Sequence, residues 1–169
     1  AREVDFIVKH SEAKGLIYDE RIAEVLADVS YSFQHIIGLK EMKEVIENCQ
    51  GQRTIAPLHA NDTAVVMYTS GTTGKPKGVM LTHQNIASTA AIWSASMTMT
   101  AQDRMFICTP LFHCAGLHVF AMPMFYKGGT VIIEESFSPI NTLEQLAKTQ
   151  ATIFFGVPSM YTILLNTPA

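Results

Sequence analysis

Short apolar segments alternate with amphipathic segments along almost the whole of this 169-residue chain. The apolar segments have the length of strands, and the amphipathic segments have the 3.6-residue spacing of helices. Strands are expected at 15–18, 35–39, 64–68, 78–81, 105–108, 130–134 and 152–155, and helices at 4–8, 22–26, 42–46, 83–97, 116–122, 141–149 and 158–165. Strands that alternate with helices pair in parallel. The sequence therefore predicts an α/β fold with a mostly parallel sheet flanked by helices.

A polar connector divides the chain. Residues 51–63 contain Pro57 and the pair Asn61 and Asp62, which are typical of a linker. Residues 1–50 are then a lead-in of alternating helices and strands, and residues 64–169 hold the remaining elements. The first residue is not methionine and charged residues follow at once, so we expect no signal peptide and interpret the chain as an excerpt from a longer protein.

The composition argues against several classes of partner. The net charge is −3, with 12 basic and 15 acidic residues, so no general field attracts nucleic acid. The most apolar stretch, 105–126, is interrupted by two prolines and two histidines and is a poor transmembrane segment. The three cysteines, Cys49, Cys108 and Cys114, form no CxxC pair, which fits a reducing cytoplasm. Each is expected to be a buried small apolar residue.

Residues 68–83, YTSGTTGKPKGVMLTH, join two expected strands and are rich in glycine, hydroxyl groups and lysine. Glycine lets backbone N–H groups converge on an anion, hydroxyls donate further hydrogen bonds, and lysine supplies charge. A polyphosphate needs these donors. The spacing is neither the Walker GxxxxGK[ST] pattern nor GxGxxG. A hairpin turn without function, the plainer interpretation, needs neither four hydroxyls nor a Lys-Pro-Lys exit.

Residues 68–83 resemble the most characteristic motif of the acyl-adenylate-forming superfamily, which includes acyl-CoA synthetases, luciferases and peptide-synthetase adenylation domains. The segment PLFHCAGL at 110–117 is similar to the next motif of that family, and GVPSMY at 156–161 is similar to the one after it. The resemblance covers nearly all of the chain. It implies a partial N-terminal AMP-binding domain, in which 64–169 are the ATP-binding and acyl-site half and the C-terminal domain is absent.

The resemblance also implies a role for each matched residue. The β- and γ-phosphates of ATP would be wrapped by Thr69, Ser70, Gly71, Thr72, Thr73 and Gly74, with Lys77 assisting and Lys75 a weaker candidate. Thr72 is a candidate ligand of the Mg²⁺ that accompanies ATP. His113 would lie beside the acyl carboxylate, and Gly116 would line the acyl pocket. No catalytic residue is assigned within the chain.

The implied reaction is ATP-dependent activation of a carboxylic acid as acyl-AMP, followed by thioester formation with coenzyme A. Segment 110–117 lacks the aspartate typical of amino-acid-activating domains, which favours an apolar acid: a long- or medium-chain fatty acid, with an aryl acid as the alternative. A non-catalytic nucleotide- or phosphate-binding module is the alternative from another class. The later family elements, a glutamate for magnesium and a C-terminal lysine among them, have no counterpart here. We therefore expect the fragment alone to be inactive, and its exposed apolar surface to promote self-association.

Four side chains within eleven positions raise the question of a zinc site: Cys108, His113, Cys114 and His118. Structural zinc ligands usually come in pairs two to four residues apart in each half of the site, and the expected strand, loop and helix direct these four differently. Apolar packing is the favoured interpretation for the cysteines, and a hydrogen-bonded helix residue is the favoured one for His118. Thr82 is expected to cap the helix at 83–97, and His83 is interpreted as a structural residue at the start of that helix.

Overall fold

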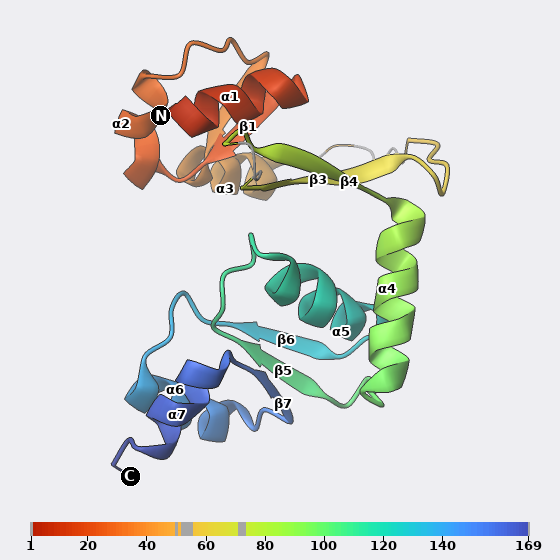
Figure 1. Cartoon of the computed structure of the whole chain (residues 1–169), viewed down its shortest axis with the longest axis vertical. Helices are drawn as coiled ribbons and strands as arrows, with labels where there is room; N and C mark the ends of the chain where they lie inside the picture. The colour runs from red at the N-terminus through yellow and green to blue at the C-terminus, as the bar shows by residue number, and fades with distance from the viewer. Residues whose placement is uncertain (1, 50, 52–55, 71–73, 169) are drawn as a thin grey trace. The chain divides into compact units, whose positions relative to one another are not determined.

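The computed structural model describes residues 2–49, 51, 56–70 and 74–168, and it divides the chain into two compact units (Figure 1). Unit 1 is Ala1–Leu81 and unit 2 is Thr82–Ala169. Each unit contains both helices and strands, so the predicted α/β class is confirmed. The strands of the described residues pair in three separate sheets, however, rather than in the single sheet that the alternation predicted.

Unit 1 contains two small sheets. Its elements are α1 (Arg2–Ser11), β1 (Gly15–Tyr18), η1 (Glu20–Ile22), α2 (Ala23–Ala27), β2 (His35–Gly38), α3 (Leu39–Asn48), β3 (Thr63–Thr69) and β4 (Lys77–Thr82), the last of which ends just past the unit boundary. Strands β1 and β2 pair in parallel with Leu16 opposite Ile36, as the alternation predicted. Strands β3 and β4 pair with each other. The predicted strands on either side of the glycine-rich loop are therefore partners.

Local polar contacts, rather than a large core, hold the helices of unit 1. Within α1 the Lys9 ammonium lies 2.6 Å from the Asp5 carboxylate one turn earlier. The same carboxylate accepts a hydrogen bond of 2.9 Å from the backbone N–H of Ser30, which ties α1 to the segment after α2. Asp19 caps η1 by accepting from the backbone N–H of Arg21 at 2.9 Å. Such exposed contacts each contribute little free energy of folding.

Unit 2 is built on a three-stranded parallel sheet with the order β6-β5-β7. Its elements are α4 (His83–Ser96), β5 (Arg104–Ile107), η2 (Ala115–Ala121), α5 (Met122–Lys127), β6 (Thr130–Ile133), α6 (Pro139–Thr149), β7 (Ile153–Phe155) and α7 (Pro158–Leu165). Helices α4 and α5 lie on one face of the sheet, and α6 and α7 lie on the other (Figure 1). This is the two-sided arrangement expected of a buried parallel sheet.

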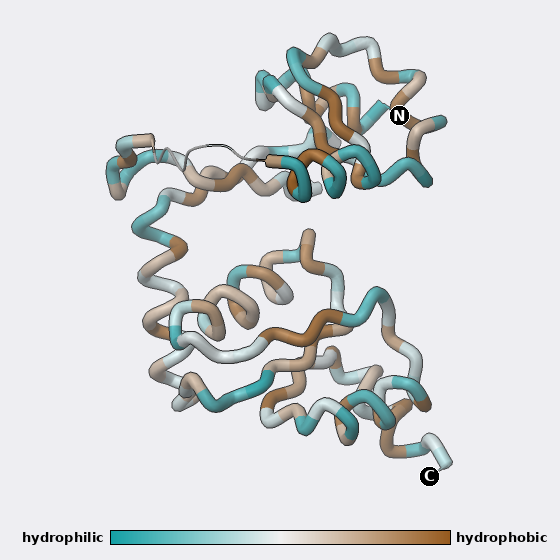
Figure 2. Tube along the Cα trace, turned by 180° about the vertical axis from the view of Figure 1, so that it is seen from behind, coloured by the Kyte–Doolittle hydropathy of each residue, from teal (hydrophilic) through white to brown (hydrophobic). Residues whose placement is uncertain are grey.

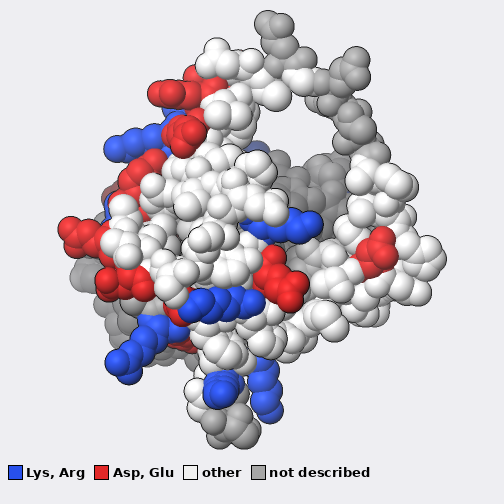
Figure 3. All heavy atoms as spheres, turned by 90° about the horizontal axis from the view of Figure 1, so that it is seen from above, with Lys and Arg blue, Asp and Glu red and all other residues white. Residues whose placement is uncertain are grey.

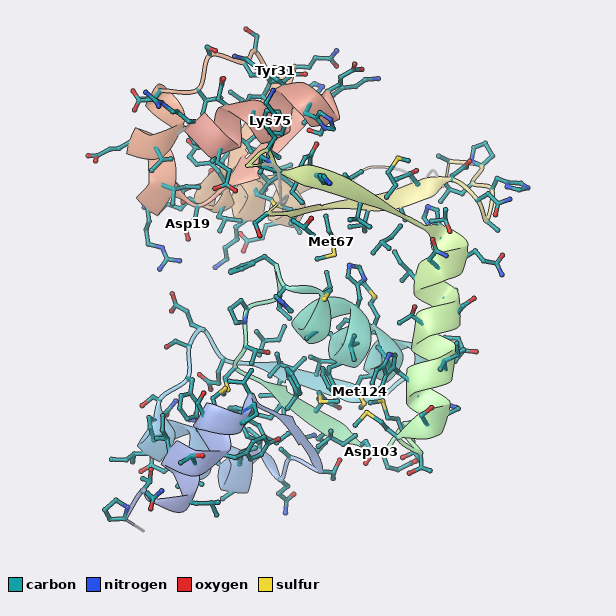
Figure 4. All side chains as sticks on the ribbon, viewed as in Figure 1. Asp19, Tyr31, Met67, Lys75, Asp103 and Met124 are labelled. Atoms are coloured by element: carbon teal, nitrogen blue, oxygen red, sulfur yellow. The ribbon has the colours of Figure 1, made fainter. Side chains whose placement is uncertain are left out.

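The central strand β5 divides the core of unit 2 into two clusters. Met105 and Ile107 pack on one face with residues of η2 and α5, including Met124, which lies between α5 and the sheet (Figure 4). Phe106 and Cys108 pack on the other face with Met160 of α7. Residues 105–107 have no exposed surface. Successive side chains of a strand point to opposite faces, so one apolar strand supplies both clusters. Figure 2 shows the apolar residues along this chain trace.

The helix predicted at 116–122 differs from prediction in length and type. It is a π-helical segment, η2, that begins at Ala115 and continues directly into α5, which ends at Lys127. Pro123 lies at the junction of η2 and α5, and the helical backbone continues through it. Gly128 ends α5 in the left-handed conformation, with φ of 74°.

Candidate functional site

The two legs of the glycine-rich loop are the end of β3 and the start of β4. Thr69 is the last residue of β3, Ser70 follows it, and Lys77 opens β4; all three are exposed. Their hydroxyl and ammonium groups are therefore accessible to an anion. Gly74 has φ of 81°, a conformation that glycine adopts without the cost of a side chain. Gly71, Thr72 and Thr73 lie outside the described residues.

Tyr68 fixes the position of both legs. Its hydroxyl shares a hydrogen bond of 2.8 Å with Nδ1 of His10 on α1, and the ring of His10 also stacks on Phe6. A Cβ at Gly78 would lie 3.3 Å from Cζ of Tyr68 and 3.0 Å from a methyl carbon of Val66. Side chains of β3 therefore pack directly over the backbone of Gly78 in β4. The loop starts and ends on strands that are held to each other and to α1.

Lys75 lines a hollow whose described lining does not include Lys77, the lysine of β4. Together with Gly74 and Pro76, it lines this hollow of about 440 Å³, whose opposite wall is formed by residues of α1, among them Arg2 and Phe6. Figure 4 labels Lys75 close to α1. Figure 3 shows basic and acidic side chains interspersed over the face in view, which agrees with the absence of a general field in the composition. The two lysines of the motif thus differ in surroundings.

A strand, not a helix, follows the loop, as the sequence indicated. Helix α4 begins one strand later and is capped by Thr82, whose Oγ1 accepts from the N–H of Asn85 at 3.1 Å. Asn85 Oδ1 accepts in return from the N–H of Thr82 at 3.0 Å, which completes a capping box. The predicted cap is confirmed, and His83 occupies the first position of the helix. The positive end of the α4 dipole is therefore separated from the loop by β4.

The second and third motifs meet in unit 2 around one cavity of about 260 Å³. Its lining residues are Thr109, Pro110, Phe112, His113, Ala115, Gly116, Phe155 and Val157. His113 and Gly116, both singled out from the sequence, thus lie on the same cavity. The lining is almost wholly apolar apart from the imidazole and one hydroxyl. Such a cavity can hold an apolar group with one polar end near His113.

His113 is oriented by its own loop. Its Nδ1 accepts a hydrogen bond of 3.2 Å from the backbone N–H of Ala115, and Sγ of Cys114 lies 3.8 Å from the same nitrogen. Because Nδ1 accepts, the neutral imidazole carries its proton on Nε2. The ring can therefore donate from Nε2 to an acceptor in the cavity.

Gly116 is required by packing. A Cβ there would lie 2.8 Å from the carbonyl oxygen of Pro110, an atom of the backbone that cannot rotate away. The close approach lets η2 begin directly against the segment that carries His113. Gly116 therefore shapes the cavity as well as lining it.

Two expectations for histidine and cysteine are wrong. His118 is buried, but neither ring nitrogen has a hydrogen-bond partner within the described part of the chain, in contrast to the expected hydrogen-bonded residue. Cys108 is buried as predicted, and burial raises the pKa of its thiol, with Glu134 adding to the effect. Cys49 and Cys114 are exposed, because one follows the last turn of a surface helix and the other lies in the loop before η2.

The described residues contain no group of three or more His, Cys, Asp or Glu side chains that could hold a metal ion. Within the same residues, no helix has the length and apolar character needed to cross a membrane.

The sequence did not single out the aromatic wall of the cavity. Phe155 lines the cavity, and its ring stacks on Phe120 of η2 at a centroid distance of 4.0 Å. The signal was present in the alternation of β7, because adjacent residues of a strand face opposite sides. Phe154 accordingly packs in the other cluster, with its ring 6.1 Å from Phe106. Which of the two phenylalanines faced the cavity could not be told without knowing what covered each face.

Comparison with known proteins agrees with this geometry. The whole chain, residues 1–169, matches the family described as AMP-binding enzyme. A feruloyl-CoA synthase from Amycolatopsis sp is 31% identical over 166 residues, which cover 98% of this chain and 33% of that protein. The long-chain-fatty-acid–CoA ligase FadD13 of Mycobacterium tuberculosis is 28% identical over 174 residues, covering 99% of this chain and 34% of that protein. The chain thus spans about a third of the length of these relatives.

Solved structures show the same fold. The inhibitor-bound N-terminal domain of FACL13 from Mycobacterium tuberculosis superposes with a TM-score of 0.91 at 28% identity, covering 99% of this chain and 43% of that one. ATP-bound MatB from Rhodopseudomonas palustris gives a TM-score of 0.81 at 30% identity over 99% of this chain and 34% of that one. The resemblance drawn from the three sequence motifs is confirmed, and the chain belongs to the AMP-binding enzyme family.

Proposed function

We propose that the chain supplies the nucleotide-phosphate and acyl-binding parts of an acid–thiol ligase. The enzyme would activate a carboxylic acid as acyl-AMP at the expense of ATP and then transfer the acyl group to the thiol of coenzyme A. The observation that carries the proposal is the meeting of two motif segments, 110–117 and 156–161, at one apolar cavity, in a chain that also carries the hydroxyl-rich loop. Relatives named as acyl-CoA and aryl-CoA ligases support the same reaction class.

The loop would hold the β- and γ-phosphates of ATP. Thr69 and Ser70 display hydroxyls on the first leg, Lys77 displays an ammonium group on the second, and Gly74 supplies the turn. Gly71, Thr72 and Thr73 complete the proposed set. Holding these phosphates favours departure of pyrophosphate when a carboxylate oxygen attacks the α-phosphorus. The ATP-bound neighbour MatB supports nucleotide binding by this fold.

Mg²⁺ would arrive with ATP rather than at a site built into the described residues. Those residues offer no cluster of three or more metal-ligating side chains, so the oxygens of the triphosphate and the hydroxyl of Thr72 are the proposed ligands. The ion would neutralise phosphate charge when bound.

His113 would donate from Nε2 to the carboxylate of the acid, with the apolar part of the acid lying along Gly116. The hydrogen bond that Nδ1 accepts from Ala115 supports this orientation, because it fixes the ring and its tautomer.

We further propose a reducing, cytoplasmic location, supported by the three unpaired cysteines.

Exchange of labelled pyrophosphate into ATP in the presence of acid tests the proposal. The measurement uses the longest natural polypeptide that contains this sequence. Thr72→Ala and Lys77→Ala should each lower the exchange rate about tenfold or more, because each loses a hydrogen bond to a charged phosphate. Lys43→Ala removes an exposed lysine of α3 and is the matched control, with no change expected.

One result would contradict the proposal, and another would contradict the separate expectation that the fragment is inactive. ATP binding without acid-dependent exchange, for every acid tried, would favour a non-catalytic phosphate-binding module. Acid-dependent exchange catalysed by the purified 169-residue chain alone would refute our expectation that this fragment is inactive.

Self-association of the 169-residue chain is also proposed. Large apolar side chains are exposed on several elements, among them Ile36 and Ile46 in unit 1 and Ile140 and Leu165 in unit 2. Exposed apolar area favours association. Sedimentation velocity over a range of concentrations measures it, and a monomer at all concentrations would be the contrary result.

A further inference from the structure

One aromatic ring in the lining of the unit 2 cavity also packs against the buried core. Phe155 of β7 lines the cavity, and its ring stacks on Phe120 with an interplanar angle of 22°. Phe120 is only 8% exposed and does not line the cavity. Phe155 therefore separates the cavity from the core.

The wall is backed by packed side chains. Phe120 belongs to the buried cluster that contains Met99 and Ile107, and its ring centroid lies 6.3 Å from that of Trp93 on α4. Protein interiors are close-packed, so the ring of Phe155 has no free space to retreat into. An acyl group in the cavity that meets Phe155 can extend no further at that point without displacing part of the core.

Another part of the lining is closely packed. A Cβ at Gly116 would lie 2.8 Å from the carbonyl oxygen of Pro110, so η2 leaves no room for a side chain at this position. The volume of about 260 Å³ is also below the usual range for ligand pockets, which is about 300–1,000 Å³. A flat ring fits against an aromatic wall with favourable stacking or edge contacts.

From these contacts we infer that the acid bound in this cavity is compact, an aryl or short-chain acid, and that Phe155, supported by Phe120, sets this limit. The inference rests on the proposed function, because it assumes that the cavity receives the acyl group. The sequence is compatible with a fatty acid or an aryl acid, and this inference favours an aryl or short-chain acid over a long-chain fatty acid. Phe155 is thus a specificity-determining residue.

The test compares Phe155→Ala and Phe155→Leu with Phe154→Leu in the longest natural polypeptide that contains this sequence. Phe154 is the matched control, because it is the neighbouring residue of the same strand and packs in the other cluster, against Phe106 and Tyr161. Pyrophosphate exchange gives kcat/KM for benzoate, cinnamate, hexanoate, dodecanoate and palmitate. Calorimetric titration with the same acids measures binding independently of turnover.

The wild type should prefer the aryl acids and hexanoate. Phe155→Ala should raise the ratio of kcat/KM for dodecanoate over cinnamate by about tenfold or more, since added pocket length discriminates by that order. Phe155→Leu should change the ratio less in the same direction. Phe154→Leu should lower activity on all acids alike, if at all. If Phe155 had only a structural role, Phe155→Ala would leave the ratio of kcat/KM for dodecanoate over cinnamate unchanged.

Two outcomes overturn the inference: a wild type that prefers dodecanoate or palmitate, or a ratio that is the same in Phe155→Ala as in Phe154→Leu. Failure of the proposed function is different, since it would abolish exchange with every acid in the wild type. Calorimetry still decides the inference then, because compact acids must bind more tightly than dodecanoate, and Phe155→Ala must reduce that difference. Absence of binding by any acid overturns both.

Discussion

Unit 1 and unit 2 hold their proposed binding residues in place by different means. Among the described residues of unit 1, only Val8 and Gly38 are buried, and the loop legs are held by the Tyr68–His10 hydrogen bond and by packing over Gly78. Unit 2 has two buried clusters, and its cavity is shaped by that packing. Groups that bind phosphate must stay accessible on strand ends, whereas a wall that limits an apolar group must be rigid. Substitutions should therefore act differently in the two units.

The largest difference is expected in stability. Phe106→Ala removes a ring with no exposed surface from the centre of unit 2 and should lower the free energy of unfolding by about 3–5 kcal/mol. Val8→Ala removes two carbons from unit 1 and should cost only about 1–2 kcal/mol. Urea unfolding of both variants, followed by circular dichroism, makes the comparison. Equal losses would show that unit 1 has a core as consequential as that of unit 2.

Gly116 of unit 2 and Gly74 of unit 1 extend this comparison of the two units. Gly116→Ala should cost about 1–3 kcal/mol of stability and weaken acid binding, because its Cβ would meet a backbone oxygen. A Cβ at Gly74 would have no atom within 4 Å, so Gly74→Ala should cost only the strain of positive φ, about 1 kcal/mol of stability. It should weaken ATP binding and leave acid binding intact. Calorimetric titration with each ligand distinguishes the two, and a loss of ATP affinity in Gly116→Ala alone would contradict the assignment.

A smaller effect is expected at the anchor of the loop. Tyr68→Phe removes the hydroxyl that bonds to His10 but keeps the ring over Gly78. A net hydrogen bond is worth about 0.5–1.5 kcal/mol, so the dissociation constant for ATP should rise less than about tenfold. His10→Phe should have the same effect, and the double variant should be no worse than either single one. Additive losses would mean that the two residues act separately.

Much of this architecture followed from local pattern. The period of apolar residues located the strands, because each buried strand is a short continuous apolar run, and Thr82 marked the start of α4 because a capping residue satisfies backbone donors that any helix leaves open. The division into separate sheets, the π-helical turn at Ala115 and the unpartnered nitrogens of His118 depend on tertiary contacts. Local sequence cannot specify what a face packs against. The position of Phe155 on the cavity could not be predicted for the same reason.

The smallest predicted effect concerns acid. In unit 1, Arg21 lowers the pKa of Asp19 from its ordinary value of 3.8 to about 2, and in unit 2 the hydroxyl of Thr152 and the N–H of Thr100 lower the pKa of Asp103, which lies at the start of β5 (Figure 4). A pKa that is lower in the folded than in the unfolded state stabilises the fold above about pH 4, and this contribution is lost as the pH falls through the folded value.

Both carboxylates are partly exposed, so these contributions are small and screened by salt. Asp103 is the more consequential of the two, because its Oδ1 accepts from Thr152 at 2.7 Å and so joins the start of β5 to the residue before β7, whereas the bonds of Asp19 stay within one turn. A contact within one turn is retained more readily in the unfolded chain than one between distant residues, so the folded and unfolded pKa values should differ less for Asp19. Asp103→Asn should therefore flatten the dependence of the thermal midpoint on pH below about pH 4 more than Asp19→Asn does. The reverse order would mean that local ion pairing, rather than the connection between strands, determines acid sensitivity, and the contrast between the two units would fail at this point.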